Sequence, residues 1–385
     1  MILLTISSDR NLFKEGSDVW NRYLDYGKLF GEIHVIVFSH KNLGNKNAKI
    51  GDNVFVYPTN HIFRVFYLCK ILKIAKGVLG LRCPKCGDLE IDHKTDSWAI
   101  TAQDPFEAGF AGWILKKIYK IPLQIQIHTD LLSRYFGRES LLNKLRVILA
   151  KFLISRADGI RVVSERIRRS LIESRLLCVA KIDVLPIFVD VKSVKNAQVK
   201  IDIHKKYPQF NFIILMASRL TKEKNIGLAI EVIAELVKKY SKIGLVVCGK
   251  GPELKNLKFK TFNLQLNENV KFEDWSNDLF SYYKTADLFL LTSNYEGYGR
   301  SVAEVMSAGL PVVMTDVGLA GEVLINDKNG IVIPVGDKKA LVSAADLLIN
   351  DNKKRNLFSC EGKKAVEDLM AKEGYLKLYK KSFNF

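Results

Sequence analysis

The stretch from Asp287 to Asp316, DLFLLTSNYEGYGRSVAEVMSAGLPVVMTD, decides the fold that we expect for this chain. It begins with a short apolar run typical of a buried strand and continues through the loop NYEGYG. The next residues have the pattern of a helix, which Gly309 and Pro311 end. A second apolar run, PVVMTD, follows directly. Strand, helix and strand in this order predict one unit of a parallel sheet.

The same alternation extends from this stretch in both directions. Short runs rich in Val and Ile, such as ILLTIS, EIHVIVFS and LQIQIHT, precede a polar, lysine-rich passage, after which NFIILMAS and IGLVVCG start the pattern again. We therefore predict an α/β protein with two doubly wound Rossmann-like domains, residues 1–190 and residues 205–370, which face each other across a cleft. A helix at about residues 372–385 is expected to pack back on the first domain. Because ligands bind at the carboxyl ends of parallel strands, each domain should supply half of one site.

Composition and charge restrict the classes of binding partner but do not identify a single class. The 385 residues carry a net charge of +18, which favours phosphates, nucleic acid or anionic lipid head groups. No run of about 18 apolar residues predicts a spanning helix, and the N-terminus lacks the pattern of a signal peptide. These features predict a cytoplasmic protein, with a possible peripheral position on the inner face of the cell membrane.

The cysteines do not have the pattern of a disulfide framework. Cys83 and Cys86, with His93 nearby, have the spacing of half a zinc site, but no second CxxC completes it. A tight turn with two free thiols and a metal site both remain open interpretations, and no metal is expected in the active site.

The second domain has polar residues at the predicted carboxyl ends of its strands. Arg219 and Lys224 follow NFIILMAS, where two cations suit a diphosphate, although a solvated basic loop explains them equally well. Gly249 and Gly251 allow close approach of a ligand, but no third glycine follows, which disfavours a nicotinamide cofactor. Glu296 lies in the loop before a helix, and Glu304 lies inside that helix, where it could accept hydrogen bonds from a diol.

These motifs resemble those of the retaining glycosyltransferases of family 4, which have the GT-B fold. EGYGRSVAE matches their E-x7-E pattern, SRLTKEK resembles their R-x4-K segment, and CGKGPE and AGLPVV match in the expected order. The resemblance implies that Arg219 and Lys224 hold the donor diphosphate, that Glu304 holds the ribose, and that Glu296 contacts the donor sugar. It further implies donor contacts from Gly16, Gly249, Gly251, Gly297, Tyr298, Gly299, Arg300 and Ser301. The chain departs from the family pattern at Asp274, Leu319 and Gly321, in loops that lie near the donor in the family.

The first domain offers fewer indications of a functional site. Asp104, His128 and Asp130 follow apolar strands and are candidates for the acceptor side. A lone histidine is more often structural than catalytic, but the resemblance implies that His128 contacts the donor sugar. Two basic and apolar stretches, residues 61–87 and residues 131–156, could lie on an anionic membrane or could be ordinary helices that face the core.

Together these features predict an enzyme: a nucleotide-sugar-dependent hexosyltransferase that retains the anomeric configuration and needs neither cofactor nor metal. The expected acceptor is a lipid-linked or cell-surface glycan precursor, and nucleic acid is not an expected partner. One alternative is a sugar-nucleotide epimerase on a similar scaffold. Another is a non-catalytic basic protein that binds anionic lipid or nucleic acid.

Overall fold

The computed structural model describes residues 1–385 except 63–66, 80–96, 176–180, 277 and 385. By contacts the chain groups into two units. Unit 1 consists of Met1–His128, Leu141–Leu185 and Lys372–Phe385, and unit 2 consists of Thr129–Ser140 and Pro186–Ala371. The stretch 129–140, which the sequence analysis assigned to the first domain, therefore groups with unit 2. Cys83, Cys86 and His93 lie outside the described residues.

Unit 1 is built on a sheet of eight strands among the described residues, in the order β3-β4-β2-β1-β5-β6-β7-β8. The strands are β1 (Ile2–Ser7), β2 (Glu32–Val37), β3 (Ala48–Ile50), β4 (Val54–Pro58), β5 (Trp98–Ala102), β6 (Leu123–Ile127), β7 (Gly159–Val162) and β8 (Lys181–Val184). All neighbours pair in parallel except β3 and β4, which form an antiparallel hairpin at the edge. The sequence analysis anticipated β4 from the run NVFVYPT but missed β3.

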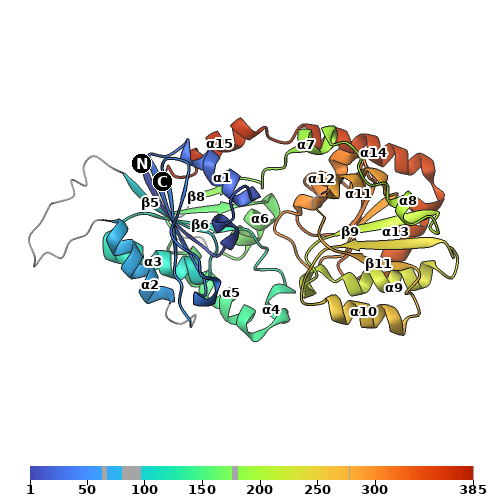
Figure 1. Ribbon diagram of the computed structural model, residues 1–385, viewed down its shortest axis with the longest axis horizontal. Helices are drawn as coiled ribbons and strands as arrows, with labels where there is room; N and C mark the ends of the chain where they lie inside the picture. The colour runs from blue at the N-terminus through green and yellow to red at the C-terminus, as the bar shows by residue number, and fades with distance from the viewer. Residues whose placement is uncertain (63–66, 80–96, 176–180, 277, 385) are drawn as a thin grey trace, which may run out of the picture. The chain divides into compact units, whose positions relative to one another are not determined.

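Helices cover both faces of the sheet of unit 1 (Figure 1). They are α1 (Asp18–Gly27), α2 (Tyr67–Val78), α3 (Glu107–Tyr119), α5 (Leu141–Ile154), α6 (Glu165–Glu173) and α15 (Lys372–Lys381). The C-terminal helix α15 lies beside α1: the ring of Tyr379 stacks on that of Tyr26 with centroids 4.1 Å apart, and the hydroxyl oxygens of Tyr375 and Tyr26 lie 2.9 Å apart. Gln124 of β6 donates to the carbonyl of Ser382 at 2.8 Å. The chain terminus is therefore part of the core of unit 1.

Unit 2 has six parallel strands among the described residues, in the order β11-β10-β9-β12-β13-β14. They are β9 (Phe212–Ala217), β10 (Ile243–Cys248), β11 (Val270–Glu273), β12 (Leu288–Leu291), β13 (Val312–Thr315) and β14 (Ile331–Ile333). This order runs outward in both directions from β9 and β12, as in a dinucleotide-type doubly wound sheet. The topological switch point therefore lies between β9 and β12.

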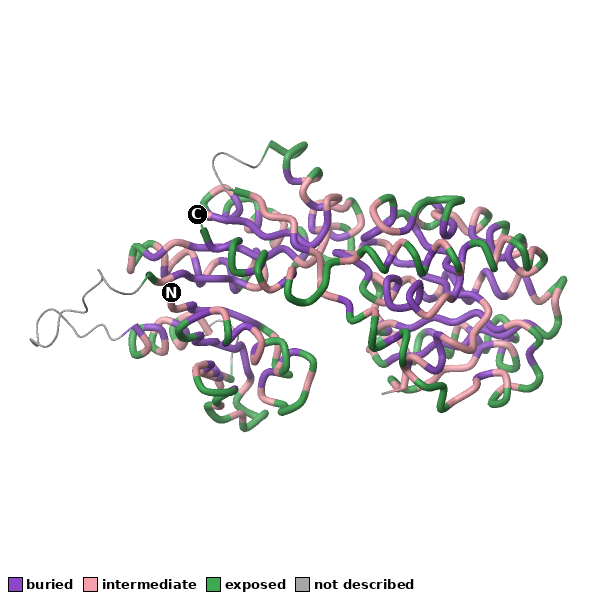
Figure 2. Tube along the Cα trace, turned by 90° about the horizontal axis from the view of Figure 1, so that it is seen from above, coloured by how far each residue is buried: buried purple, intermediate pink, exposed green. Residues whose placement is uncertain are grey.

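Helices cover both faces of the sheet of unit 2 (Figure 1). They are α4 (Phe136–Glu139), α7 (Val191–Asn196), α8 (Ile203–Lys206), α9 (Ile226–Leu236), α10 (Leu254–Asn263), α11 (Leu279–Thr285), α12 (Arg300–Ala308), α13 (Lys338–Asn350) and α14 (Asn352–Glu367). α9 packs against α10 and α13 on one face, and α12 packs against α11 and α14 on the other. The buried side chains concentrate in the strands and on the inner sides of these helices (Figure 2). The predicted α/β class with two parallel-sheet domains is thus confirmed.

Candidate active site

The switch point of unit 2 brings two predicted motifs together. β9 leads through residues 218–225 to α9, and β12 leads through residues 292–299 to α12. Because β9 and β12 are neighbours and their helices go to opposite faces, both loops begin side by side at the carboxyl edge. The sequence positions of Lys224 and Glu296 are far apart, but this topology makes them partners.

Lys224 and Glu296 form an ion pair at this edge. The Lys224 Nζ donates to Glu296 Oε1 at 2.5 Å, and the two side chains are only 14% and 12% exposed. Ser293 Oγ donates to the same carboxylate oxygen at 2.8 Å. A pair with so little access to water is screened much less than a surface pair, so its two charges are fixed in place.

Further hydrogen bonds join the two loops. The Thr292 hydroxyl donates to the carbonyls of Lys224 at 2.9 Å and Asn225 at 3.0 Å. The backbone amide of Asn294 donates to the carbonyl of Glu223 at 2.7 Å. The sequence analysis missed Thr292 and Ser293 as positioning residues. Their only signal was their place between a buried strand and Glu296, which many structural Ser and Thr residues share.

Arg219 lies on the same loop as Lys224 in a more exposed setting. Its side chain is 75% exposed, and its Nη2 lies 3.2 Å from Glu223 Oε1. A contact at such exposure contributes little to stability, so the guanidinium can turn to another anion at small cost. The structure thus places a fixed cation, Lys224, and an adaptable one, Arg219, on the loop after β9.

Glu304 lies inside α12 and is buried, with 8% exposure. Its carboxylate accepts from Arg300 Nε at 2.6 Å and from the Tyr283 hydroxyl at 3.4 Å. Burial, followed by the charge of Glu304, raises the pKa of Tyr283 well above its ordinary value, so that hydroxyl keeps its proton and can donate. Arg300 and Glu304 therefore form a pair one helical turn apart at the start of α12.

The turn before α12 is fixed by its backbone. Gly299 has φ of 91°, in the left-handed region that glycine adopts without strain, and it precedes the first helical residue. The carbonyl of Tyr298 accepts from the amide of Leu319 at 2.8 Å, and Leu319 is fully buried. Leu319, one of the departures from the family pattern, therefore supports this turn from the core. Gly297 is also buried, whereas Ser301 is half-buried at the first turn of α12.

The glycines after β10 have a structural role that the sequence analysis did not foresee. A Cβ at Gly249 would lie 1.9 Å from the Ser218 carbonyl oxygen, and one at Gly251 would lie 2.2 Å from that of Leu220. The loop after β10 thus crosses directly over the loop after β9, and any side chain there would displace it. Donor contacts by the two glycines stay a prediction.

Two candidates of unit 1, Asp104 and His128, follow β5 and β6. Asp104 Oδ1 accepts from the amides of Phe106 at 2.8 Å and Ala108 at 3.2 Å, which caps the start of α3. Burial raises the pKa of Asp104 to about 6 in spite of those amides. For His128, at the end of β6, burial followed by Arg161 and Arg22 lowers the pKa to about 3, so the imidazole is neutral near pH 7.

Two further candidates are placed by the backbone. Gly16 has φ of 73° and precedes Ser17, whose hydroxyl caps α1 by accepting from the amide of Trp20 at 3.2 Å. Asp130 groups with unit 2, whereas His128 groups with unit 1. Within the described residues, no group of three or more His, Cys, Asp or Glu side chains could hold a metal ion. A metal-free reaction therefore remains a prediction.

Two family models match adjacent parts of the chain. The model described as Glycosyl transferases group 1 matches residues 199–365, and the one described as Glycosyltransferase Family 4 matches residues 93–193. The capsular polysaccharide biosynthesis glycosyltransferase CapM of Staphylococcus aureus is 26% identical over 289 residues, which are 72% of this chain and 73% of that protein. The alpha-monoglucosyldiacylglycerol synthase of Streptococcus pneumoniae is 28% identical over 237 residues, 58% of this chain and 53% of that protein. The chain thus matches about half the length of the latter.

Solved structures with the same fold include Anabaena HepE in complex with UDP, with a TM-score of 0.73 and 21% identity over 99% of both chains. Sucrose-phosphate synthase from Thermosynechococcus elongatus has a TM-score of 0.76 and 17% identity over 100% of this chain and 99% of that one. These likenesses establish the GT-B fold. With the family matches over residues 93–193 and 199–365, they show that the chain is a nucleotide-sugar-dependent glycosyltransferase with the GT-B fold, similar in its second unit to the group 1 glycosyl transferases.

Proposed function

We propose that unit 2 holds the donor at the carboxyl edge of β9 and β12, and that the Lys224–Glu296 pair is the centre of that site. The observation that carries this proposal is the 2.5 Å contact between two nearly buried, opposite charges from loops that meet at the switch point. Lys224 and Arg219 neutralise the donor diphosphate. Glu296 accepts from hydroxyls of the donor sugar, and Glu304 accepts from the ribose.

The reaction that this arrangement supports retains the anomeric configuration. The bond between the sugar C1 and the diphosphate oxygen breaks, and the acceptor hydroxyl oxygen bonds to C1 on the same face. The acceptor proton passes to an oxygen of the departing diphosphate, so no carboxylate nucleophile is needed. The two cations stabilise the charge that develops on the leaving group, which is the task that a metal performs in other enzymes. The neutral His128 suits a contact with a sugar hydroxyl rather than with a phosphate.

A panel of nucleotide sugars, assayed for nucleotide release with and without a glycan or lipid acceptor, tests this proposal. UDP is the first nucleotide to try, because the HepE structures contain it. We expect release that depends on an acceptor and a product with the anomeric configuration of the donor, determined by NMR. Release of a modified nucleotide sugar without acceptor would instead identify an epimerase. Turnover should survive EDTA, and a loss that only manganese or magnesium restores would contradict the metal-free reaction.

We further infer that the acceptor is lipid-linked and is met at an anionic membrane surface. The similarity to the alpha-monoglucosyldiacylglycerol synthase supports this inference, because the name of that relative describes a lipid product. So does α5, which leaves a row of large apolar side chains in solvent: Leu141 at 77% exposure, Leu142 at 49%, Leu145 at 63%, Ile148 at 66% and Phe152 at 39%. Lys144 and Lys151 are exposed on the same helix. An exposed apolar row with lysines matches a helix that lies in an anionic interface.

The described part of the other candidate membrane stretch, residues 61–87, gives less support to membrane contact. α2 buries Ile71 and Ala75 in unit 1, as a core-facing helix does. No helix among the described residues is long and apolar enough to cross a membrane. Membrane contact is therefore expected mainly through α5.

Sedimentation with anionic and neutral vesicles tests the membrane inference. We expect binding to anionic vesicles that salt weakens, because each lysine near such a surface contributes about 1 kcal/mol. Replacing Leu145 and Ile148 by Ser should reduce vesicle binding, while the affinity for nucleotide in unit 2 stays unchanged. Exchanging Ile118 and Ile172 for Ser, which removes exposed apolar side chains from α3 and α6, is the matched control. If the wild type ignores anionic vesicles at low salt, a soluble acceptor replaces the lipid-linked one.

A further inference from the structure

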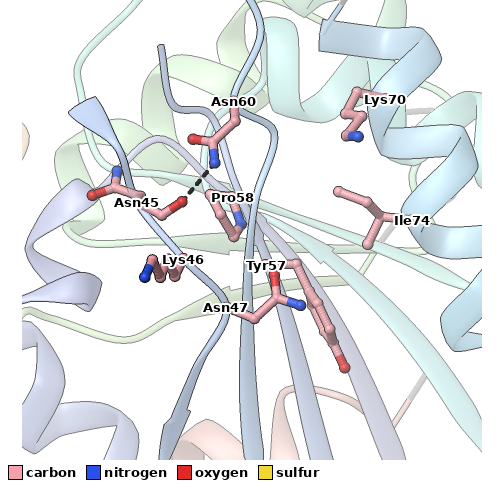
Figure 3. A pocket seen from close by; sticks show the side chains of 8 residues that line it. All are labelled: Asn45, Lys46, Asn47, Tyr57, Pro58, Asn60, Lys70 and Ile74. Atoms are coloured by element: carbon pink, nitrogen blue, oxygen red, sulfur yellow. Dashed lines mark hydrogen bonds between the residues drawn. The ribbon is translucent and has the colours of Figure 1, made fainter. Parts of the chain in front are cut away.

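Unit 1 contains a polar pocket that none of the predicted site residues line. It has a volume of about 580 Å³ and lies between α2 and the loops that flank the β3–β4 hairpin. In Figure 3, Lys70 and Ile74 of α2 face the pocket from one side, and residues of the two loops face it from the other. Its lining residues are Asn45, Lys46, Asn47, Tyr57, Pro58, Asn60, Lys70 and Ile74.

The loop wall of the pocket is fixed by hydrogen bonds. Asn60 adopts φ of 45°, and its amide nitrogen donates to the carbonyl of Asn45 at 2.6 Å (Figure 3). Its amide oxygen accepts from the hydroxyl of the buried Ser39 at 2.8 Å, and the backbone amide of Asn60 donates back to that hydroxyl at 3.1 Å. Every polar group of the Asn60 side chain is thus engaged. The two loops are held together before any ligand arrives, which lowers the cost of binding one.

The remaining polar groups of the lining are available to a ligand. Within the described part of the chain, the side chains of Lys46, Asn47 and Lys70 make no hydrogen bond or ion pair. Two cations and an amide therefore face the pocket, and none of its lining residues is acidic. Ile74 and Pro58 add apolar surface beside these groups. This combination suits a ligand that has an anionic group, hydroxyls and a small apolar face.

The place of the pocket in the fold connects it with the acceptor half of the enzyme. The parallel strands of this sheet have their carboxyl ends at one edge, and Asn60 follows β4 at that edge. Gly16, Asp104 and His128 follow other strands of the sheet at the same edge. Because β3 runs antiparallel to β4, residues 45–47 at its start reach the same edge. The pocket therefore lies along the ligand-binding edge of unit 1, towards the outer strands.

We propose that this pocket is an acceptor subsite that binds a sugar unit bearing a phosphate or carboxylate, with Lys46 and Lys70 as the anion contacts. The proposal rests on the proposed function, since it makes the acceptor of the same enzyme an anionic glycan or a glycan phosphate. Lys46 and Lys70 are specificity-determining residues here: they select a charged sugar over a neutral one and take no part in the chemistry of the donor.

Binding of three probes to the full chain tests the subsite: glucose 6-phosphate, glucose and inorganic phosphate, followed by NMR or calorimetry. We expect glucose 6-phosphate to bind best, because charge-assisted contacts and sugar hydroxyls act together. Lys46→Gln with Lys70→Gln should weaken its binding about tenfold, as the loss of charged hydrogen bonds does. The control is Lys41→Gln with Lys73→Gln, which removes the same charge from neighbouring exposed positions that do not line the pocket.

Each outcome decides the proposal. It is overturned if the wild type binds glucose 6-phosphate no better than glucose, if no probe binds, or if the control pair weakens binding as much as the pocket pair. Preference for inorganic phosphate over glucose 6-phosphate would also overturn it, since the sugar would then contribute nothing. UDP affinity, measured on the same variants, should not change. If no nucleoside diphosphate of the panel binds the wild type, the proposed function fails, whereas the probe measurements still decide the pocket.

Discussion

The polar residues at the carboxyl edges of the two sheets differ in their partners. In unit 2 the candidate residues form ion pairs, Lys224 with Glu296 at 2.5 Å and Arg300 with Glu304 at 2.6 Å. In unit 1 neither Asp104 nor His128 has an ion pair among the described residues. Burial raises the pKa of Asp104 to about 6, and burial followed by Arg161 and Arg22 lowers that of His128 to about 3. Burial without a counter-charge favours the neutral form of any group.

This difference indicates a division of labour between equivalent positions of two similar sheets. Under the proposed function a diphosphate donor is bound by charged side chains, and the ion pairs of unit 2 would supply them. Sugar hydroxyls suit neutral donors and acceptors, and His128 is the neutral group that we propose for this contact in unit 1. Mutations in unit 2 should therefore change turnover or nucleotide affinity, whereas mutations in unit 1 should change how stability depends on pH. These different responses test the comparison.

The largest effect is expected at Glu296. Glu296→Ala should lower kcat more than it changes nucleotide affinity, because the contact is assigned to the sugar and loss of a charged hydrogen bond costs about 1.5 to 3 kcal/mol, tenfold or more in rate. The variant also leaves Lys224 without its partner. Glu296→Gln, which keeps an acceptor for Ser293, and thermal unfolding of both variants separate the loss of chemistry from the loss of structure. A fall in nucleotide affinity with unchanged kcat would reverse the assignment.

A smaller effect, of a different kind, is expected at Glu304. Glu304→Ala should chiefly weaken binding of the bare nucleoside diphosphate, by about tenfold, because a charged hydrogen bond to the ribose is lost. Calorimetry with UDP measures this directly. Arg300→Gln removes the partner of Glu304 and is the companion variant: it should affect nucleotide binding less, since the acceptor for the ribose remains. Unchanged affinity in Glu304→Ala would exclude the ribose contact.

In unit 1 the effects should appear in the pH dependence of stability. The folded-state pKa of His128, about 3, lies below the ordinary value of 6.5, so below pH 6.5 the unfolded chain takes up a proton that the folded chain refuses. The stability contributed by neutral His128 is therefore present above pH 6.5 and is lost as the pH falls towards 3. His128→Asn should lose less stability on acidification than the wild type. Thermal unfolding of both proteins at pH 7 and pH 5 measures this difference. If the variant and the wild type lose the same stability between these pH values, the pKa of His128 is not lowered.

Asp104 should show the smallest effect, with the opposite sign. Its folded-state pKa, about 6, lies above the ordinary value of 3.8, so the folded chain holds a proton that the unfolded chain releases. Its contribution to stability is present below pH 3.8 and is lost as the pH rises through 6. Asp104→Asn, which keeps an oxygen to cap α3, should gain stability relative to the wild type over this range. A parallel pH profile for the two proteins would contradict the raised pKa.

The fold class could be predicted from the sequence because the patterns that indicate it are local. Apolar runs such as NFIILMAS and the helix limits at Gly309 and Pro311 act within a few residues, so strands and helices could be placed without the structure. The parallel sheets followed from the alternation. Strand β3 was missed because Ala48–Ile50 is too short to show a period, although Gly51 with φ of 59° marks the turn between β3 and β4.

The sequence by itself determined which residues stand at the ends of strands, including Arg219, Lys224 and Glu296, because their motifs lie within single loops. Only the tertiary structure decided what those residues contact. The Lys224–Glu296 pair exists because the strand order makes β9 and β12 neighbours, and the strand order depends on packing between distant segments. The lowered pKa of His128 has the same origin, since it depends on burial and on Arg161 and Arg22, which come from distant parts of the sequence.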